Sequence, residues 1–523
     1  MNGAQALTRT LVDHGVDTCF MNPGTSEMHF VAALDTVTEL RGVLALFEGV
    51  ATGAADGYAR MAGRPAATLL HLGPGLGNGL ANLHNARKGH TPVVNIVGDH
   101  ATYHKQYDAQ LESDIETVAR NVSTFVRRST SPETVAADAV DTITAAYGPP
   151  GQVATLILPA DASWSEGGQP VAPAASWSPA GFRGAPPAPG VVADVVSALR
   201  SGEPTALLVG GRVVHGSLLD DVGRVSAATG ARLLAETFPA RLERGAGRVP
   251  VERLAYLAEF TAMQLDGLRH LVLVDAASPV SFFAYPGKPS ELVPEGCTVH
   301  RLAGPADDAA TALAAVVEEL GCRGTEPVRQ PEGRPVAPTG ALTAQTVCEA
   351  LGALLPEGAI VSDEGNTAGL FAPGATAGAA PHDWLCLTGG AIGQGLPAAV
   401  GAAVACPDRR VVALEADGSA LYTLQSWWTM AREGLDVTTI ILNNRSYAVL
   451  NMELERVGAE PPGPRAKAML DLTGPGLDFC SLARGLGLEA ASASTAAEFT
   501  EALGKALATP GPSVVEAVIP SAL

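Results

Sequence analysis

The chain has 523 residues, of which 47% are hydrophobic and 17% charged, and its formal net charge is −20. This length predicts two to four domains, and the composition excludes a largely disordered chain because it can bury a large core. The acidic balance, without a cluster of Lys and Arg, argues against a nucleic-acid-binding protein.

The seven cysteines form no CxxC pair, so neither a zinc cluster nor a disulfide framework is expected. The N-terminal residues lack the shape of a signal peptide, and no uncharged apolar stretch approaches the ~20 residues of a membrane helix. We therefore expect a cytoplasmic protein with no membrane partner.

Two segments rich in Pro and Gly, residues 165–190 and 323–340, divide the chain into three blocks. Within each block, short apolar runs alternate with amphipathic stretches, which predicts parallel sheets covered by helices on both faces. The predicted strands lie within residues 65–72, 92–99, 153–159, 205–211, 270–277, 358–365, 410–418 and 438–444, and helices are predicted over 131–147 and 496–508. The predicted fold class is α/β, with three doubly wound parallel-sheet domains over residues 1–165, 185–325 and 338–523.

Polar clusters follow two neighbouring strands of the third block. One strand, Val411–Glu415, ends at Asp417, and the next, Thr438–Leu442, ends at Asn444. The helical spacing of the apolar residues between them predicts a crossover helix, so both ends lie at one edge of a parallel sheet, where such sheets bind ligands. A carboxylate and a carboxamide suit Mg²⁺, and the N-terminus of the crossover helix suits phosphate. The unit predicts a magnesium–diphosphate site, the alternative being two ordinary turns.

This unit resembles the cofactor motif of thiamine diphosphate (ThDP) enzymes, in which GDG is followed, after a spacer, by NN. The resemblance implies that Asp417, Asn444 and the main-chain carbonyl of Ser446 hold Mg²⁺. Ala416 stands where the motif has its first glycine, which is tolerable if the backbone there has a negative φ. Neighbours implied to bind the cofactor are Gly418, Ser419 and Tyr447.

In the first block, Glu48 follows an apolar strand and precedes a Gly- and Ala-rich helix that contains "AADGYAR". A buried carboxylate without a partner is costly, and a cofactor nitrogen is a suitable partner. The resemblance implies that Glu48 hydrogen-bonds the aminopyrimidine of ThDP and activates the cofactor. The alternative is a glutamate that interacts with the helix dipole.

The stretch "NPGTSEMHF", residues 22–30, resembles the loop after the first strand in benzoylformate decarboxylase-like members of the family. His71 begins a Gly-rich turn that lines the active site of those enzymes, where a histidine transfers protons; a structural histidine is the alternative. A second active-site histidine would fall in "SPVSFFAYPG", where Ala284 and Tyr285 stand instead. Residues assigned to the cofactor here are Asn22, Pro23 and Gly24, and candidate substrate residues are Thr25, His100 and His104.

In the third block, "LTGGAIGQG" precedes Asp417 at the family's usual interval. The resemblance implies that Ile392 wedges ThDP into its bent conformation and that the carbonyl of Gly390 accepts a hydrogen bond from the aminopyrimidine. In "DEGNTAGLF", Asn366 and Thr367 are candidates for contact with the diphosphate.

The resemblance covers all three blocks and implies pyrimidine-binding, central and diphosphate-binding domains. It also implies a homodimer or homotetramer with active sites at the subunit interface. The expected reaction is ThDP- and Mg²⁺-dependent decarboxylation of a 2-keto acid, ending in release of an aldehyde or in acyloin formation with an aldehyde or ketone acceptor.

Two alternatives stay open. One is an acetolactate synthase-type enzyme that acts on pyruvate and carries FAD in the central domain, where "LVGGRVVHG" is a candidate flavin-contacting turn. The other is a non-catalytic subunit that keeps the fold as a scaffold.

Overall fold

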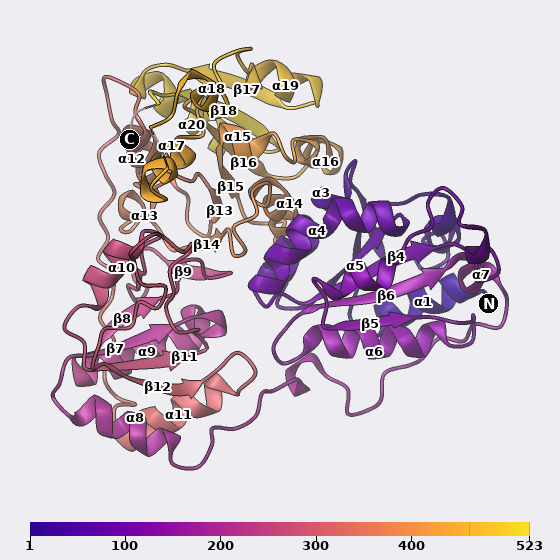
Figure 1. The fold of residues 1–523 in the computed structure, drawn as a ribbon, viewed down its shortest axis with the longest axis horizontal. Coiled ribbons are helices and arrows are strands. Elements are labelled where there is room, and N and C mark those ends of the chain that lie inside the picture. Colours follow the sequence, from indigo (N-terminus) through magenta and orange to yellow (C-terminus); the bar gives the residue numbers. More distant parts are fainter. Residues whose placement is uncertain (460, 522–523) are drawn as a thin grey trace.

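The computed structural model describes the backbone of residues 1–459 and 461–521, which form three α/β domains, each built on its own sheet (Figure 1). The first sheet is six-stranded, the second five-stranded and the third seven-stranded. All pairs in the first two sheets are parallel, and the α/β fold class is confirmed.

The first sheet is covered by helices on both faces. Its strands, in spatial order, are β2 (Arg41–Leu44), β1 (Thr18–Asn22), β3 (Ala66–Leu70), β4 (Val93–Asp99), β6 (Val153–Pro159) and β5 (Phe125–Arg128). Its helices are α1 (Gly3–Asp13), α2 (Met28–Ala33), α3 (Glu48–Ala62), α4 (Leu72–Lys88), α5 (Ile115–Arg120), α6 (Val135–Tyr147) and α7 (Ala160–Trp164). Successive residues of a strand point to opposite faces, so Leu69 packs among residues of α1 and α6, whereas Leu70 packs among residues of α3 and α4.

The central sheet is smaller and entirely parallel. Its strands, in spatial order, are β10 (Glu252–Arg253), β8 (Arg232–Ala235), β7 (Thr205–Val209), β11 (His270–Val274) and β12 (Thr298–Ala303). Its helices are α8 (Val191–Arg200), α9 (Gly216–Thr229), α10 (Ala258–Leu265) and α11 (Ala309–Leu320). The strand order reverses direction beside β7, which places the usual ligand crevice of such a sheet at the carboxyl ends of β7 and β11.

The third sheet contains both strands of the predicted magnesium unit. Its strands, in spatial order, are β17 (Glu489–Ala493), β18 (Ser513–Val518), β16 (Val437–Asn443), β15 (Val411–Ala416), β13 (Ile360–Glu364), β14 (His382–Cys386) and β9 (Leu242–Arg244). Its helices are α12 (Ala344–Leu354), α13 (Ala372–Ala375), α14 (Gly395–Ala405), α15 (Asp417–Ala420), α16 (Gln425–Glu433), α17 (Ala448–Arg456), α18 (Pro464–Ala468), α19 (Phe479–Gly485) and α20 (Ala496–Ala508).

Two details of the third domain differ from the prediction. β9 comes from the central block and pairs antiparallel with β14, so the sheet is not purely parallel. The predicted crossover helix is broken: α15 has only four residues, and α16 begins at Gln425. Leu421, one of the apolar residues whose spacing predicted the crossover helix, lies in this break and is 38% exposed. The periodicity of apolar residues does not reveal this break, because the same helical spacing continues on both sides of it.

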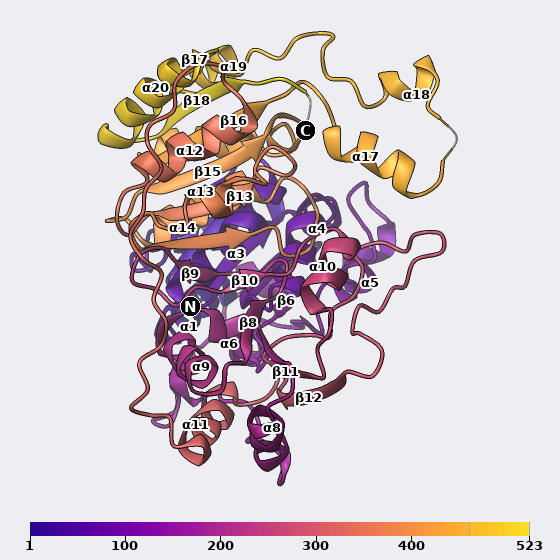
Figure 2. The same ribbon diagram turned by 90° about the vertical axis from the view of Figure 1, so that its left-hand side faces the viewer.

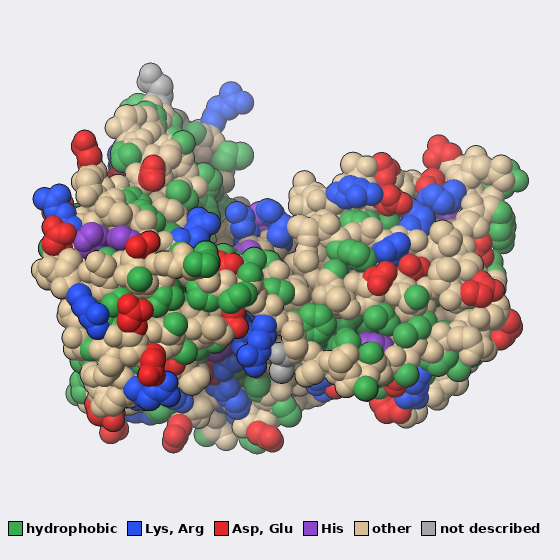
Figure 3. Space-filling view, turned by 90° about the horizontal axis from the view of Figure 1, so that it is seen from below, with side chains coloured by type: hydrophobic (Ala, Val, Ile, Leu, Met, Phe, Trp, Pro, Cys, Tyr) green, Lys and Arg blue, Asp and Glu red, His purple; other side chains and the backbone are tan. Residues whose placement is uncertain are grey.

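The central and third domains are also tied by side chains at α17, which projects from one edge of the third domain (Figure 2). Arg456 Nη2 donates to Glu259 Oε2 of α10 at 3.0 Å, and its guanidinium lies 4.5 Å from the centre of the Tyr285 ring. Seen from below, a notch separates the central domain from the first domain, and charges of both signs are spread over the surface (Figure 3). Among the described residues, no helix is long and apolar enough to cross a membrane.

The first and third domains meet where α3 crosses α14. A Cβ on Gly57 would lie 2.1 Å from the carbonyl oxygen of Ala398, and a Cβ on Gly401 would lie 1.9 Å from that of Ala54. Glycine at both positions therefore allows the two helices to touch along their backbones. The contact buries apolar residues of both helices in one shared core.

A buried ion pair reinforces this contact. Arg60 makes two hydrogen bonds to the carboxylate of Asp56, at 2.6 and 2.8 Å, and both side chains are almost completely buried. Arg60 Nη1 also donates to the carbonyl of Cys386 at 2.8 Å, and Gln394 Nε2 donates to Asp56 at 2.5 Å. Residues of two domains thus satisfy one buried charge pair.

We expect Arg60→Ala to lower the free energy of unfolding by about 3–5 kcal/mol, because it leaves the Asp56 carboxylate buried without its cation. Thermal and denaturant unfolding measure the effect. Arg323→Ala is the matched control, since the Arg323–Glu318 pair is exposed, and it should cost less than about 0.5 kcal/mol. Equal losses in the two variants would contradict this role of Arg60.

Candidate active site

The predicted magnesium ligands meet at the carboxyl edge of the third sheet. β15 and β16 are adjacent and parallel, with Ala416 opposite Leu442. Asp417 Oδ2 accepts a hydrogen bond from the backbone N–H of Arg445 at 2.6 Å, so the chain after β16 folds onto Asp417. Arg445 has a φ of 57°, which turns this loop sharply. Ala416 has a φ of −77°, as expected, and carries no backbone strain.

The surroundings of Asp417 fit a divalent cation. Its side chain is buried, backbone N–H groups of Gly418 and Arg445 donate to it, and no ion pair to it is found among the described residues. Burial raises the pKa of this carboxyl above its ordinary value. A buried carboxylate with no cation is unfavourable, and Mg²⁺ is bound by oxygen ligands of this kind. Asn444 supplies a carboxamide at the same edge, with its Oδ1 accepting from the backbone N–H of Ser446 at 3.0 Å.

Other predicted cofactor residues gather at this edge. Asn366 Nδ2 donates to Ser419 Oγ at 2.8 Å, which brings the loop after β13 to the start of α15. Thr367 follows in the same loop. The ring of Tyr447 lies against Gly418, where a Cβ would come within 2.4 Å of it.

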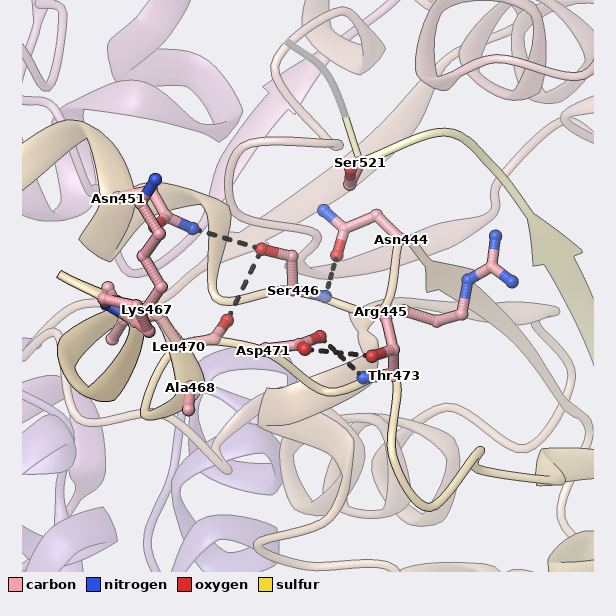
Figure 4. A pocket seen from close by; sticks show the side chains of 11 residues that line it. Asn444, Arg445, Ser446, Asn451, Lys467, Ala468, Leu470, Asp471, Thr473 and Ser521 are labelled. Carbon is pink, nitrogen blue, oxygen red and sulfur yellow. Dashed lines mark hydrogen bonds between the residues drawn. The ribbon is translucent and has the colours of Figure 1, made fainter. Parts of the chain in front are cut away.

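A pocket of about 480 Å³ lies beside the loop that carries Asn444 and Ser446 (Figure 4). Its far wall comes from α18 and the chain that follows, including Lys467 and Asp471. The backbone of Tyr447 donates to the carbonyl of Leu470 at 3.0 Å, so this wall is tied to the metal-ligand loop.

The loop with Gly390 and Ile392 is held by a residue that sequence reasoning did not single out. Glu364, the last residue of β13, is 2% exposed and accepts from the backbone N–H groups of Gly393 at 2.6 Å and Gly395 at 2.5 Å. Burial raises its pKa to about 7. An acidic residue directly before "GNT" is visible in the sequence. Its partners are not, because Gly393 and Gly395 lie 29 and 31 residues further along the chain.

Glu48 occupies the first position of α3, at the carboxyl edge of the first sheet, and is 6% exposed. Asn78 Nδ2 donates to its Oε2 at 3.0 Å. A Cβ on Gly75 would lie 3.0 Å from its Oε1, so a larger residue would crowd that oxygen. The carboxylate is thus buried with a neutral donor, and no cation pairs with it among the described residues.

His71 lies at the next strand end, where it precedes α4. Its Nδ1 bonds Glu27 Oε2 at 2.7 Å, and the backbone N–H of Gly24 donates to the same oxygen at 2.7 Å. Asn22 ends β1 directly before this turn, with Pro23 between it and Gly24. Glu27 lies in residues 22–30, the stretch that resembles a loop of the family, but no role was predicted for Glu27 itself.

Two further candidate substrate residues, His100 and His104, lie close to each other, with ring centres 5.3 Å apart, but make no hydrogen bond to His71 among the described residues. Tyr285, which stands where a second active-site histidine was expected, is buried against Arg456. Phe282, three residues before it, contacts the loop with Gly390 and Ile392, since a Cβ on Gly390 would lie 2.6 Å from the Phe282 ring.

Helix α4 links the segment that follows Glu48 to the loop that carries Ile392, within one chain. Asn82 Nδ2 donates to the carbonyl of Gly49 at 2.8 Å and to that of Gly393 at 3.0 Å. Asn85 Nδ2 donates to the carbonyl of Ala391 at 2.8 Å. The helix that follows Glu48 and the loop that carries Ile392 are therefore fixed relative to each other.

Comparison with known proteins identifies the class of protein that this fold and site define. Residues 1–119 match the family model described as thiamine pyrophosphate enzyme, N-terminal TPP binding domain, and residues 367–517 match its C-terminal TPP binding domain. The chain belongs to the thiamine diphosphate-dependent enzymes, as its motifs predicted.

Its relatives narrow the group. The chain is 60% identical over 522 residues, covering 100% of this chain and 99% of the relative, to a Mycobacterium tuberculosis protein that carries the name acetolactate synthase large subunit IlvX. It is 30% identical to benzoylformate decarboxylase of Pseudomonas aeruginosa, with 96% of both chains covered. The solved structure of the thiamine diphosphate-dependent 4-hydroxybenzoylformate decarboxylase of Rhodococcus jostii RHA1 superposes with a TM-score of 0.83 at 24% identity over 99% of both chains, which shows the shared fold.

Glu364→Gln should weaken ThDP binding about tenfold or more, because the amide has only one acceptor oxygen and its NH₂ faces the backbone N–H of either Gly393 or Gly395. Titration calorimetry with saturating Mg²⁺ measures the dissociation constant. Glu357→Gln, at an exposed position of the same domain, is the control and should bind as the wild type does. Unchanged affinity of Glu364→Gln would show that the loop is held by other contacts.

Proposed function

We propose that this ThDP enzyme requires Mg²⁺ and decarboxylates a 2-keto acid, then releases an aldehyde or joins the acyl group to a carbonyl acceptor. The observation that carries the proposal is the pair of buried carboxylates, Glu48 and Asp417, at the two sheet edges, each without a cation partner among the described residues. A non-catalytic scaffold would have no need for either, since an unpaired buried carboxylate lowers stability.

Each residue has a role in this proposal. Bound ThDP supplies the electron sink that makes loss of CO₂ feasible. Asp417, Asn444 and the carbonyl of Ser446 would hold Mg²⁺. Asn366, Thr367 and Ser419 would contact the diphosphate, with Gly418 allowing close approach. Residues that would enclose the rest of the cofactor are Asn22, Pro23, Gly24, Gly390, Ile392 and Tyr447.

Two side chains of the first domain act on protons in the proposed mechanism. Glu48 would hydrogen-bond the aminopyrimidine ring and so activate the cofactor. His71 bonds Glu27 through Nδ1, which leaves Nε2 for a proton transfer with the substrate. His71 is partly exposed, as a group that meets substrate must be.

The central domain favours an enzyme without FAD. The turn after β7 carries Gly210 and Gly211, and the carboxyl groups of Glu236 and Asp275 lie directly against these two glycines. Asp275 Oδ2 accepts from the backbone N–H of Arg212 at 2.9 Å, and Glu236 Oε1 accepts from that of Ala277 at 2.8 Å. The backbone donors that would bind a nucleotide phosphate are therefore already occupied by anionic groups.

Aromatic side chains favour a substrate with an aryl or bulky apolar group. Phe282, which lies against Gly390, has its ring centre 5.2 Å from that of Tyr256 and 6.0 Å from that of Phe238. Such a wall beside the cofactor loop provides apolar contact area for a ring. The names of the decarboxylase relatives are consistent with this class.

Incubation with a panel of 2-keto acids tests the function. With ThDP and Mg²⁺ we expect CO₂ from benzoylformate at a higher kcat/KM than from pyruvate; aldehyde or acyloin products then separate the two branches. Glu48→Gln should lower kcat by about 10²-fold or more, because cofactor activation is lost. Glu39→Gln, on the surface of the same domain, is the control. Absence of CO₂ from every 2-keto acid would reject the proposal, and tightly bound flavin would reject the FAD-free form.

We further propose that the active sites form between two copies of the chain. Large apolar side chains remain exposed directly beside both half-sites: Leu46 is 47% exposed next to Glu48, and Tyr422 is 53% exposed next to α15. Leu370 is 69% exposed in the loop after Asn366. Exposed apolar side chains around a functional edge are typical of a surface that a partner covers.

Mixing two inactive variants tests this arrangement. Glu48→Gln and Asp417→Ala should each be inactive alone. After co-refolding or subunit exchange at equal amounts, roughly a quarter of wild-type activity should return, because half of the dimers are hybrids with one intact site. No recovery in proven hybrids would show that Glu48 and Asp417 serve the same site within one chain.

A further inference from the structure

Glu27 is completely buried at the edge of the first sheet, in the short turn after β1. Its Oε2 accepts from the backbone N–H of Gly24 and bonds His71 Nδ1, both at 2.7 Å. Its Oε1 has no hydrogen-bond partner among the described residues. Oε2 thus makes both of these hydrogen bonds of the Glu27 carboxylate, and Oε1 makes none among the described residues.

Two glycines make room for this pair. A Cβ on Gly98, at the end of β4, would lie 1.6 Å from Glu27 Oε1, and a Cβ on Gly24 would lie 2.2 Å from His71 Nδ1. Neither glycine has a positive φ, so steric space, and not backbone conformation, is what an added side chain would remove. Three strand ends, those of β1, β3 and β4, therefore converge on one carboxylate–imidazole contact.

We propose that Glu27 is the positioning residue of His71: it fixes the ring with Nδ1 inward and Nε2 toward the substrate, and it stabilises the protonated ring. This inference rests on the proposed function only for the statement that His71 meets the substrate. The bond itself is independent of the reaction.

The hydrogen-bond chemistry assigns the proton. The backbone N–H of Gly24 can only donate, so Glu27 Oε2 accepts there, and in the ionised form of Glu27 the same oxygen also accepts from His71. His71 Nδ1 therefore carries a hydrogen, and in the neutral ring Nε2 has the lone pair. When His71 takes up a second proton, the imidazolium lies against the buried carboxylate of Glu27.

Other charged groups nearby are already paired. Asp99, beside Gly98, is bound by Lys105 and Arg128, and Glu48 is bound by Asn78. His71 is the titratable side chain in direct contact with Glu27. Burial raises the pKa of Glu27 above its ordinary value, and the attraction of His71 opposes that rise. A pKa that is raised in the folded state means that the stability contributed by this group is present at low pH and is lost as pH rises through the folded-state pKa.

The isosteric variant Glu27→Gln tests the charge. The amide oxygen can still accept from Gly24 and His71, so the geometry survives while the negative charge is lost. In the cofactor-free protein labelled with ¹⁵N at histidine, the His71 ring should keep its Nδ1–H form but gain its second proton only at lower pH than in the wild type. Glu133→Gln, an exposed change in the same domain, should leave this titration unchanged.

Kinetics then test the consequence. Glu27→Gln should lower kcat about tenfold to a hundredfold with little change in KM or in ThDP affinity, and the alkaline limb of the kcat profile should move to lower pH. In a His71→Ala background, adding Glu27→Gln should have no further effect, since Glu27 acts through His71.

The outcomes separate the two proposals. An unchanged His71 titration in Glu27→Gln, with the variant folded, overturns the role of Glu27 whatever the enzyme catalyses. A pH-independent loss of kcat would also overturn it, because it would indicate a structural effect. If no 2-keto acid reacts but the titration shifts as expected, the proposed reaction fails and the Glu27–His71 contact stands.

Discussion

The close contact between α3 and α14 is the constraint on which the rest of the site depends. Glu48 begins α3, and α14 follows directly after the loop with Gly390 and Ile392, so the crossing of the two helices sets how the Glu48 carboxylate and that loop lie relative to each other within one chain. Backbone approach at Gly57 and Gly401 requires the absence of side chains, and the buried Arg60–Asp56 pair allows one crossing geometry. Well-packed interfaces of this kind behave as rigid units.

Four acidic side chains at the strand ends have the same kind of surroundings. Glu27, Glu48, Glu364 and Asp417 are all buried and are bound by backbone N–H groups, an amide or an imidazole, with no Lys or Arg as partner among the described residues. Their carboxyl groups are thus held in place without a cationic side chain as partner. In the proposed mechanism two of them would meet a positive group: Asp417 would meet Mg²⁺, and Glu27 would meet a protonated His71. Glycine next to three of them leaves the space that this burial requires.

Local patterns carried most of the fold prediction. Apolar runs such as residues 93–99 and 437–443 became strands, and the polar residues after them, Asp417 and Asn444, lie at one sheet edge because consecutive parallel strands place their ends there. β9 was missed since its pairing with β14 joins segments about a hundred and forty residues apart. The break between α15 and α16 was missed because its apolar spacing imitates a continuous helix.

The sequence by itself determined the fold class, the family and the positions of Glu48, His71, Asp417 and Asn444, because each of these follows from periodicity or from a motif within a few residues. Only the tertiary structure decided which groups these side chains meet. Glu27 and His71 are 44 residues apart, and Glu364 and Gly393 are 29 apart. Their contacts arise from strand register and from how closely two backbones approach, and neither quantity is encoded in a local pattern.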